Sequence, residues 1–225
     1  MLVAPWRFLE IIKMNKVISE IQADIDWRIS EIATIKSITV DLSLSEHKKA
    51  AARKYSIPAF YAVWESFVVK SFETYIIFLN SLEMSFTNIN SHILTHNSYA
   101  CLSLANPPQN NIDKKKEFIS KIYNYIKNKI KISTDISTHS NVDFKCLTEI
   151  CYRYKVYTLD RETFEGELNK FVNLRNKIAH GDNSVIINQE YVDSVSELII
   201  KAMDSLCENI ENAMNNEEYI KEPIV

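Results

Sequence analysis

The chain has 225 residues, of which 46% are hydrophobic and 24% charged, and its formal net charge is −3. Only two residues are glycine, Gly166 and Gly181, whereas glycine makes up about 7% of an average protein. Glycine supplies the positive φ of tight hairpins and the close backbone approach to phosphates, so a Walker loop, a G-x-G-x-x-G turn and a many-stranded β-barrel are excluded. The small negative charge provides no global basic field, so any contact with nucleic acid has to be local. The composition therefore predicts a mostly helical protein.

Two long helices are predicted in the N-terminal part of the chain. The segment from about Trp6 to Thr39 has no glycine or proline, and its isoleucines from 18 to 35 recur at intervals of three and four, which is the period of a helical stripe. Ser45 is a cap-type residue for a second helix from Glu46 to about Asn80. Pro58 lies inside this second helix, and we expect it to kink the helix there.

The middle of the chain is less regular. Residues 81–112 show no single period, and the polar run 106–111 with its two prolines predicts a loop. Asp113 is the predicted cap of a third helix, whose apolar residues extend to Ile130. The polar, β-branched stretch 133–140 is predicted to be a connector.

Three more helices are predicted in the C-terminal part. A short helix spans about 142–154, and the next begins near Asp160 and ends at Gly181, since a glycine in left-handed conformation is a common helix terminator. Asn188 is the predicted cap of the last helix. The charged tail from residue 215 is expected to fray.

These elements predict an all-α fold, an antiparallel bundle of about five to seven helices of which two are long. We interpret residues 1–225 as a single domain, with a core at about 6–214 and a charged tail at 215–225. The four cysteines show no C-x-x-C pair, which favours reduced thiols and a cytoplasmic location. No secretory signal is apparent, and the most apolar stretch, 56–79, contains three charged residues, so it is predicted to be a core helix and not a membrane span.

The chemistry of the sequence is concentrated near the end of the predicted helix 160–181. His180 carries a group that titrates near neutrality, and Arg175 carries a permanent cation that fits phosphate oxygens. A general base and a cation are sufficient to cleave RNA without a metal, because the base deprotonates the ribose 2′-hydroxyl and the cation stabilises charge on the phosphate. Asn176, four residues before His180, shares its helical face and could orient the imidazole or a phosphate.

The motif R-N-x-x-A-H-G, from Arg175 to Gly181, resembles the R-x(4–6)-H motif of the HEPN superfamily of helical domains, many of which are metal-independent endoribonucleases. The rest of the chain, from about 20 to 205, is similar to the RiboL-PSP branch of that superfamily. Val63 and Ser66 depart from the pattern of this branch, in which His and Gly are more usual. The similar segments are Asp26-Trp27-Arg28, residues 57–67 with the pattern Y-A-x-W-E-x-F, and Ser140-Asn141-Val142.

The resemblance implies a dimeric helical bundle whose two copies of the motif meet in one cleft. It implies an endoribonuclease of toxin–antitoxin or antiviral-defence systems, with Arg175 and His180 catalytic, Asn176 and Glu65 supporting, and Gly181 ending the helix. The expected products carry 2′,3′-cyclic phosphate and 5′-hydroxyl ends. By the same analogy Arg175 is the expected partner of Glu65. No metal, other cofactor or membrane is expected, and the expected partners are RNA, a second copy of the chain and a cognate antitoxin or defence protein.

Several residues also have a purely structural interpretation. His180 suits a helix end because the helix dipole favours a cation there, and Glu65 could belong to a structural ion pair. The lysine-rich segment 114–131 could follow an RNA backbone or simply be a solvated helix face. His92 and His96 could share a helical face, but they lack metal-binding partners and are interpreted as surface residues. The alternative function is a non-catalytic module that binds RNA, a nucleotide or a partner protein.

Overall fold

The computed structural model describes residues 5–102 and 111–221, and within those ranges it contains seven helices and no strand. The all-α class and the two long helices are therefore confirmed. The helices are α1 (Pro5–Val40), α2 (Glu46–Ser81), α3 (Ser91–Leu102), α4 (Ile112–Lys127), α5 (Phe144–Tyr154), α6 (Arg161–Ala179) and α7 (Gln189–Asn215).

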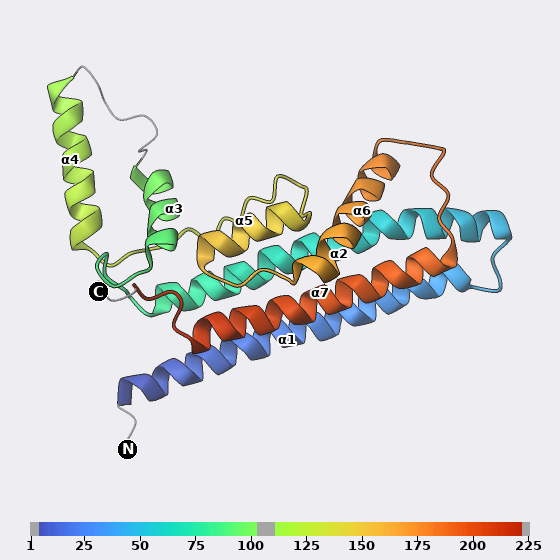
Figure 1. Ribbon diagram of the computed structural model, residues 1–225, viewed down its shortest axis with the longest axis horizontal. Helices are drawn as coiled ribbons and strands as arrows, with labels where there is room; N and C mark the ends of the chain where they lie inside the picture. Colours follow the sequence, from blue (N-terminus) through green and yellow to red (C-terminus); the bar gives the residue numbers. More distant parts are fainter. Residues whose placement is uncertain (1–4, 103–110, 222–225) are drawn as a thin grey trace.

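The three long helices α1, α2 and α7 lie side by side, with α1 antiparallel to the other two (Figure 1). The isoleucine stripe of α1 faces α2 and α7, and Ile25 is fully buried between these helices. Trp64 and Phe67 of α2 are also fully buried. The helix α2 continues without a break through Pro58, and the kink expected at this proline stays a prediction.

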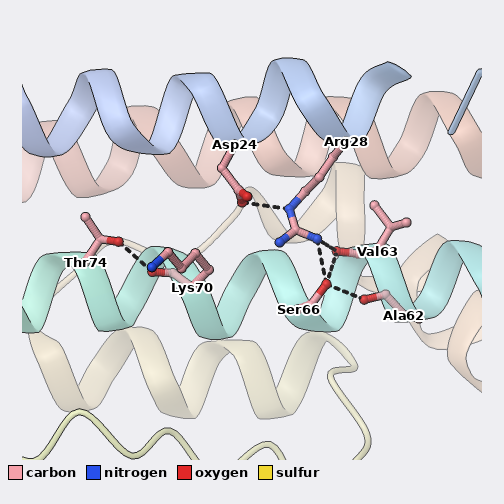
Figure 2. A network of polar contacts seen from close by, with 7 residues as sticks. All are labelled: Asp24, Arg28, Ala62, Val63, Ser66, Lys70 and Thr74. Carbon is pink, nitrogen blue, oxygen red and sulfur yellow. Dashed lines mark hydrogen bonds and ion pairs between the residues drawn. The ribbon is translucent and has the colours of Figure 1, made fainter. Parts of the chain in front are cut away.

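A buried arginine joins α1 to α2, as Figure 2 shows. Arg28 is only 5% exposed, and its Nε donates to Asp24 Oδ2 at 2.7 Å. Its Nη1 donates to the Val63 carbonyl at 2.8 Å and to Ser66 Oγ at 2.6 Å. The guanidinium therefore meets a carboxylate on its own helix and two acceptors on α2, which offsets the cost of burying its charge. Only the Ser66 acceptor depends on the side chain, because Val63 contributes its backbone carbonyl.

The shorter helices α3, α5 and α6 lie on the side of α2 away from α1 (Figure 1). Trp64 of α2 donates from Nε1 to the Val142 carbonyl at 3.0 Å, just before α5 begins. Phe72 of α2 contacts Tyr154 of α5 with a ring separation of 5.7 Å. The helix α2 is thus covered on both sides and forms the central element of the bundle.

Two predictions for the middle of the chain need correction. The helix α3 was not predicted, and the cap of α4 is Asn111, whose side chain accepts from the backbone N–H groups of Asp113 and Lys114. Asp113 instead lies in the first turn, where its charge suits the helix dipole. Of the predicted loop 106–111, residues 106–110 lie outside the described residues. The connector at 133–140 is confirmed.

The helix α4 stands apart from the core and contacts α3 (Figure 1). None of its residues is fully buried. Its lysines are exposed, as both interpretations of this segment require, the solvated face and the RNA contact.

The tail does not fray immediately after α7. Tyr219 is only 1% exposed, and its hydroxyl donates to Glu10 Oε1 at 2.6 Å. Backbone hydrogen bonds join Asn90 N–H to the Tyr219 carbonyl and Lys221 N–H to the Asn88 carbonyl. The expectation of a fraying tail is therefore wrong as far as residue 221, because an aromatic anchor docks it. Within the described ranges, no helix combines the length and apolarity needed to cross a membrane.

Candidate active site

The C-terminal end of α6 is closed by a paired hydrogen-bond motif at Gly181. The Gly181 N–H donates to the Ile178 carbonyl and the Asp182 N–H donates to the Lys177 carbonyl, each at 3.0 Å. This is the Schellman arrangement, which needs a left-handed residue at the glycine position, and Gly181 has a φ of +81°. Gly181 therefore ends the helix as predicted, and it leaves His180 as an exposed residue at the helix end.

The Arg175 guanidinium lies flat against an aromatic ring of α2. Its Cζ is 3.4 Å from the centroid of the Tyr61 ring, and its Nη2 donates to the Ser140 carbonyl at 2.6 Å. Its Nε is buried and has no hydrogen-bond partner within the described part of the chain. A guanidinium held in this way by a ring and a carbonyl is oriented before any ligand arrives.

Tyr61 connects the arginine to the loop that precedes α5. The residue is only 4% exposed, and its hydroxyl accepts a hydrogen bond from the Val142 N–H at 2.9 Å. Burial, helped by the nearby Glu65 carboxylate, raises the pKa of Tyr61 to about 12, so the phenol is neutral at physiological pH. Tyr61 is therefore a fixed platform for Arg175.

Asn176 holds the same loop from the adjacent position of α6. Its Nδ2 donates to Asn141 Oδ1 at 3.0 Å. His139 and Ser140 have φ values of +49° and +53°, a left-handed conformation that is unfavourable for residues with a Cβ. Arg175 and Asn176 contact this strained segment directly, so α6 and the loop 138–143 form one rigid wall of the site.

Glu65 does not pair with Arg175, contrary to the expectation from the family analogy. Its Oε1 accepts a hydrogen bond from Thr138 Oγ1 at 2.6 Å. The physical reason is that the Arg175 guanidinium reaches the Tyr61 ring and the Ser140 carbonyl instead. Glu65 is half-buried and anchors the start of the same loop, so its contribution to the site is through Thr138.

The structure thus brings Arg175, Asn176 and Glu65 together around Tyr61 and the loop 138–143. His180 stands beyond them, and among the described residues no hydrogen bond or ion pair joins it to Arg175. Sequence reasoning missed the role of Tyr61 and of Thr138. The signal for Tyr61 and the loop was nevertheless present, since the segments 57–67 and 140–142 were both noted as similar to the family.

No group of three or more His, Cys, Asp or Glu residues in the described ranges is arranged to hold a metal ion. The groups that meet where α2, α6 and the loop 138–143 come together are a guanidinium, two amides and a carboxylate, and the His180 imidazole is exposed beyond them at the end of α6. A guanidinium fits the oxygens of a phosphate, and an exposed imidazole can exchange protons with a ligand held beside it.

Comparison with known families identifies the family of the chain. A family model described as HEPN_MAE_28990-like HEPN matches residues 17–219 of the chain. No curated protein and no solved structure matches it. The HEPN superfamily is thereby confirmed, while the RiboL-PSP branch stays a prediction. Because the match covers most of the 225 residues, the chain belongs to the HEPN_MAE_28990-like family of HEPN domains.

Proposed function

We propose that the protein is a metal-independent endoribonuclease that acts as a toxin or antiviral-defence effector. The observation that carries this proposal is the end of α6, where an oriented Arg175 precedes an exposed His180 by five residues. Membership of the HEPN family supports the proposal, since many HEPN domains cleave RNA.

The proposed reaction is an internal transesterification. His180 removes the proton from the ribose 2′-hydroxyl, and the 2′-oxygen forms a bond to the adjacent phosphorus. The bond from phosphorus to the 5′-oxygen breaks, and that oxygen takes up a proton to become a 5′-hydroxyl. The other product carries a 2′,3′-cyclic phosphate. Arg175 stabilises the charge on the non-bridging oxygens, and its platform on Tyr61 keeps it oriented without reorganisation.

A second copy of the chain would complete the site. Five residues of an α-helix place two side chains about 140° apart around the axis, so Arg175 and His180 of one copy diverge. Arg175 is held against α2, whereas His180 is exposed at the helix end. In a two-fold dimer, the His180 of one copy can approach the Arg175 of the other. A cognate antitoxin or defence partner would cover the same exposed end.

The cytoplasm is the proposed location, where RNA is accessible and thiols are reduced. Cys146, Cys151 and Cys207 are free thiols, which fits that compartment. No cofactor is required by the proposed reaction.

One observation favours the alternative function, a non-catalytic module that binds RNA or a partner protein. Arg175 already donates to the Ser140 carbonyl of its own chain. In a binding module this contact is permanent, whereas in the nuclease a phosphate competes with it.

Cleavage of RNA in the presence of EDTA tests the proposal. The wild type is expected to cleave, and both Arg175→Ala and His180→Ala are expected to lose cleavage. Arg161→Ala is the matched control, since Arg161 is exposed on the same helix and pairs with Glu165. Cleavage unaffected by either site variant would contradict the assignment, and a complete lack of cleavage of any RNA by the wild type would favour the binding module.

A further inference from the structure

A groove with polar and aromatic walls lies between α3 and α5, at a distance from Arg175 and His180. Its cavity has a volume of about 670 Å³, within the range of pockets for small ligands. The α3 wall includes His92 and His96, which the sequence suggested to be ordinary surface residues. We call this feature the α3–α5 groove, and beside the two histidines it is lined by Ser91, Thr95, Glu149, Tyr152 and Arg153.

The groove continues past a pair of contacting rings. His92 and Tyr152 meet edge to face with their centroids 4.5 Å apart. Both residues also line a neighbouring hollow of about 240 Å³, which Lys155 and Tyr157 border as well. The ring pair is therefore a shared wall of two adjoining depressions along α5.

Tyr152 is the main apolar surface available to a ligand in this groove. Its side chain is 68% exposed although it contacts His92. An exposed tyrosine in a concave site offers a π-face on which a nucleic-acid base of any identity can stack. Ser91 and Thr95 add hydroxyl groups that can hydrogen-bond to a sugar or a base edge.

Two cations along the groove can contact an anionic group of a ligand. Arg153 and Lys155 are basic, while the acidic neighbours are Glu149 and Glu218. Glu149 is 3.9 Å from the ammonium of Lys145, and Glu218 accepts a hydrogen bond from the Tyr157 hydroxyl at 2.7 Å. Both carboxylates keep their charge, but neither Arg153 nor Lys155 has an ion-pair partner within the described part of the chain, so both cations are available to a phosphate.

The helix α5 connects this groove to the candidate active site. It begins directly after the loop 138–143, which Arg175 and Asn176 hold, and it ends beside the groove. Its eleven residues correspond to a length of about 16 Å. Since α3, α5 and α6 lie on one side of α2 (Figure 1), a few nucleotides of a single strand are sufficient to extend from Arg175 to Tyr152.

We propose that the α3–α5 groove binds the part of a single-stranded RNA that flanks the scissile phosphate, with a base stacked on Tyr152 and a phosphate beside Arg153. The inference rests on the proposed nuclease function, and it means that the RNA substrate runs along the face formed by α3 and α5. The main rival path is the lysine face of α4, where Tyr123 is also exposed and Lys127 lies 5.7 Å from its ring centroid.

Binding of a substrate analogue that cannot be cleaved tests the groove separately from catalysis. The probe is a short, fluorescein-labelled 2′-O-methyl oligoadenylate, in which the attacking hydroxyl is blocked, and the readout is fluorescence anisotropy. Tyr152→Ala is expected to weaken binding about fivefold or more, because a base stacked on an aromatic ring contributes at least that factor. Tyr152→Phe retains the ring and is expected to bind like the wild type.

Tyr123→Ala is the matched control, because it removes an equally exposed tyrosine from α4. Wild-type binding by Tyr152→Ala, or weakened binding by Tyr123→Ala alone, would overturn the proposal. Adenosine monophosphate that binds as tightly as the oligonucleotide would also overturn it, because the groove would then be a mononucleotide site.

The His180→Ala variant separates the two proposals. It is expected to lose cleavage and to keep the Tyr152-dependent binding of the probe. If the wild type binds the probe through Tyr152 but cleaves no RNA, the nuclease function fails while the groove still binds RNA. If the wild type cleaves RNA and Tyr152→Ala binds the probe normally, the nuclease stands and the groove proposal fails.

Discussion

The two glycines of the chain should respond in opposite directions to the same substitution. Gly166 lies in the interior of α6 with helical geometry, and an added Cβ there meets no atom within 4 Å. Gly166→Ala is therefore expected to stabilise the protein by about 1 kcal/mol, the difference in helix propensity between the two residues. Gly181 is equally open, but its φ is +81°. Gly181→Ala is expected to destabilise the protein by about 1–2 kcal/mol, the cost of a left-handed residue with a Cβ.

Thermal or urea unfolding of the two variants and the wild type measures this difference. For a chain of this size, 1 kcal/mol corresponds to a shift in Tm of about 2–4 °C. Cleavage adds a second readout, since Gly181→Ala disturbs the turn that presents His180, whereas Gly166→Ala leaves the helix end intact. A change of the same sign in both variants would refute the reasoning, because the predicted difference arises entirely from backbone conformation.

Three further predictions concern the contacts around α2. Arg28→Met should lower the free energy of unfolding in urea by about 3 kcal/mol, because it leaves Asp24 without its buried partner. The exposed control Lys16→Met should change that free energy by less than about 0.5 kcal/mol. Equal effects of the two substitutions would contradict the buried network. Tyr61→Leu should lower kcat/KM for RNA cleavage roughly tenfold or more, because it removes the ring under Arg175. Tyr61→Phe keeps that ring and should lose less activity. Equal losses in both variants would show that the ring is not the platform. The raised pKa of Tyr61 implies a contribution to stability that is fully present below pH 10.0 and is lost as the pH rises through about 12. In Tyr61→Phe the free energy of unfolding should therefore fall less steeply with alkaline pH. A pH profile identical to that of the wild type would contradict the assignment.

Most of the helical framework could be predicted because its signals are local. The spacing of isoleucines, the cap at Asn188 and the terminator at Gly181 act over one or two turns, whereas Ser45 stands at the start of α2 without a side-chain cap hydrogen bond. The helix α3 escaped prediction because serine, threonine and asparagine residues weaken its intrinsic preference. Tertiary contacts stabilise it instead, since Asn97 donates from Nδ2 to Tyr125 and to the Lys131 carbonyl.

The site residues on α6 could be predicted from the sequence, whereas the contacts that α2 and the loop 138–143 make with them could not. Arg175, Asn176 and His180 stand within six residues, so their shared position was visible in the sequence. The platform under Arg175 was not, because Tyr61 on an apolar stripe has the pattern of an ordinary core residue. Its role depends on the loop 138–143, which is about eighty residues away in sequence and contacts Tyr61 only in the folded protein.

The position of the tail likewise depends on a distant contact. Tyr219 follows a charged stretch that is typical of a frayed end. Its hydroxyl donates a hydrogen bond to Glu10, near the other end of the chain. Its ring packs edge to face on Phe78, with the two ring centroids 5.7 Å apart. A single buried aromatic residue therefore outweighs the local charge pattern.

The chemical ends of the RNA products test the central claim most directly. Mass spectrometry of RNA incubated with the wild type in EDTA should find 2′,3′-cyclic phosphate and 5′-hydroxyl ends, and these should disappear with His180→Ala and with a 2′-O-methyl substrate. Products with 3′-hydroxyl ends, or cyclic phosphate ends that persist in both Arg175→Ala and His180→Ala, would contradict the account.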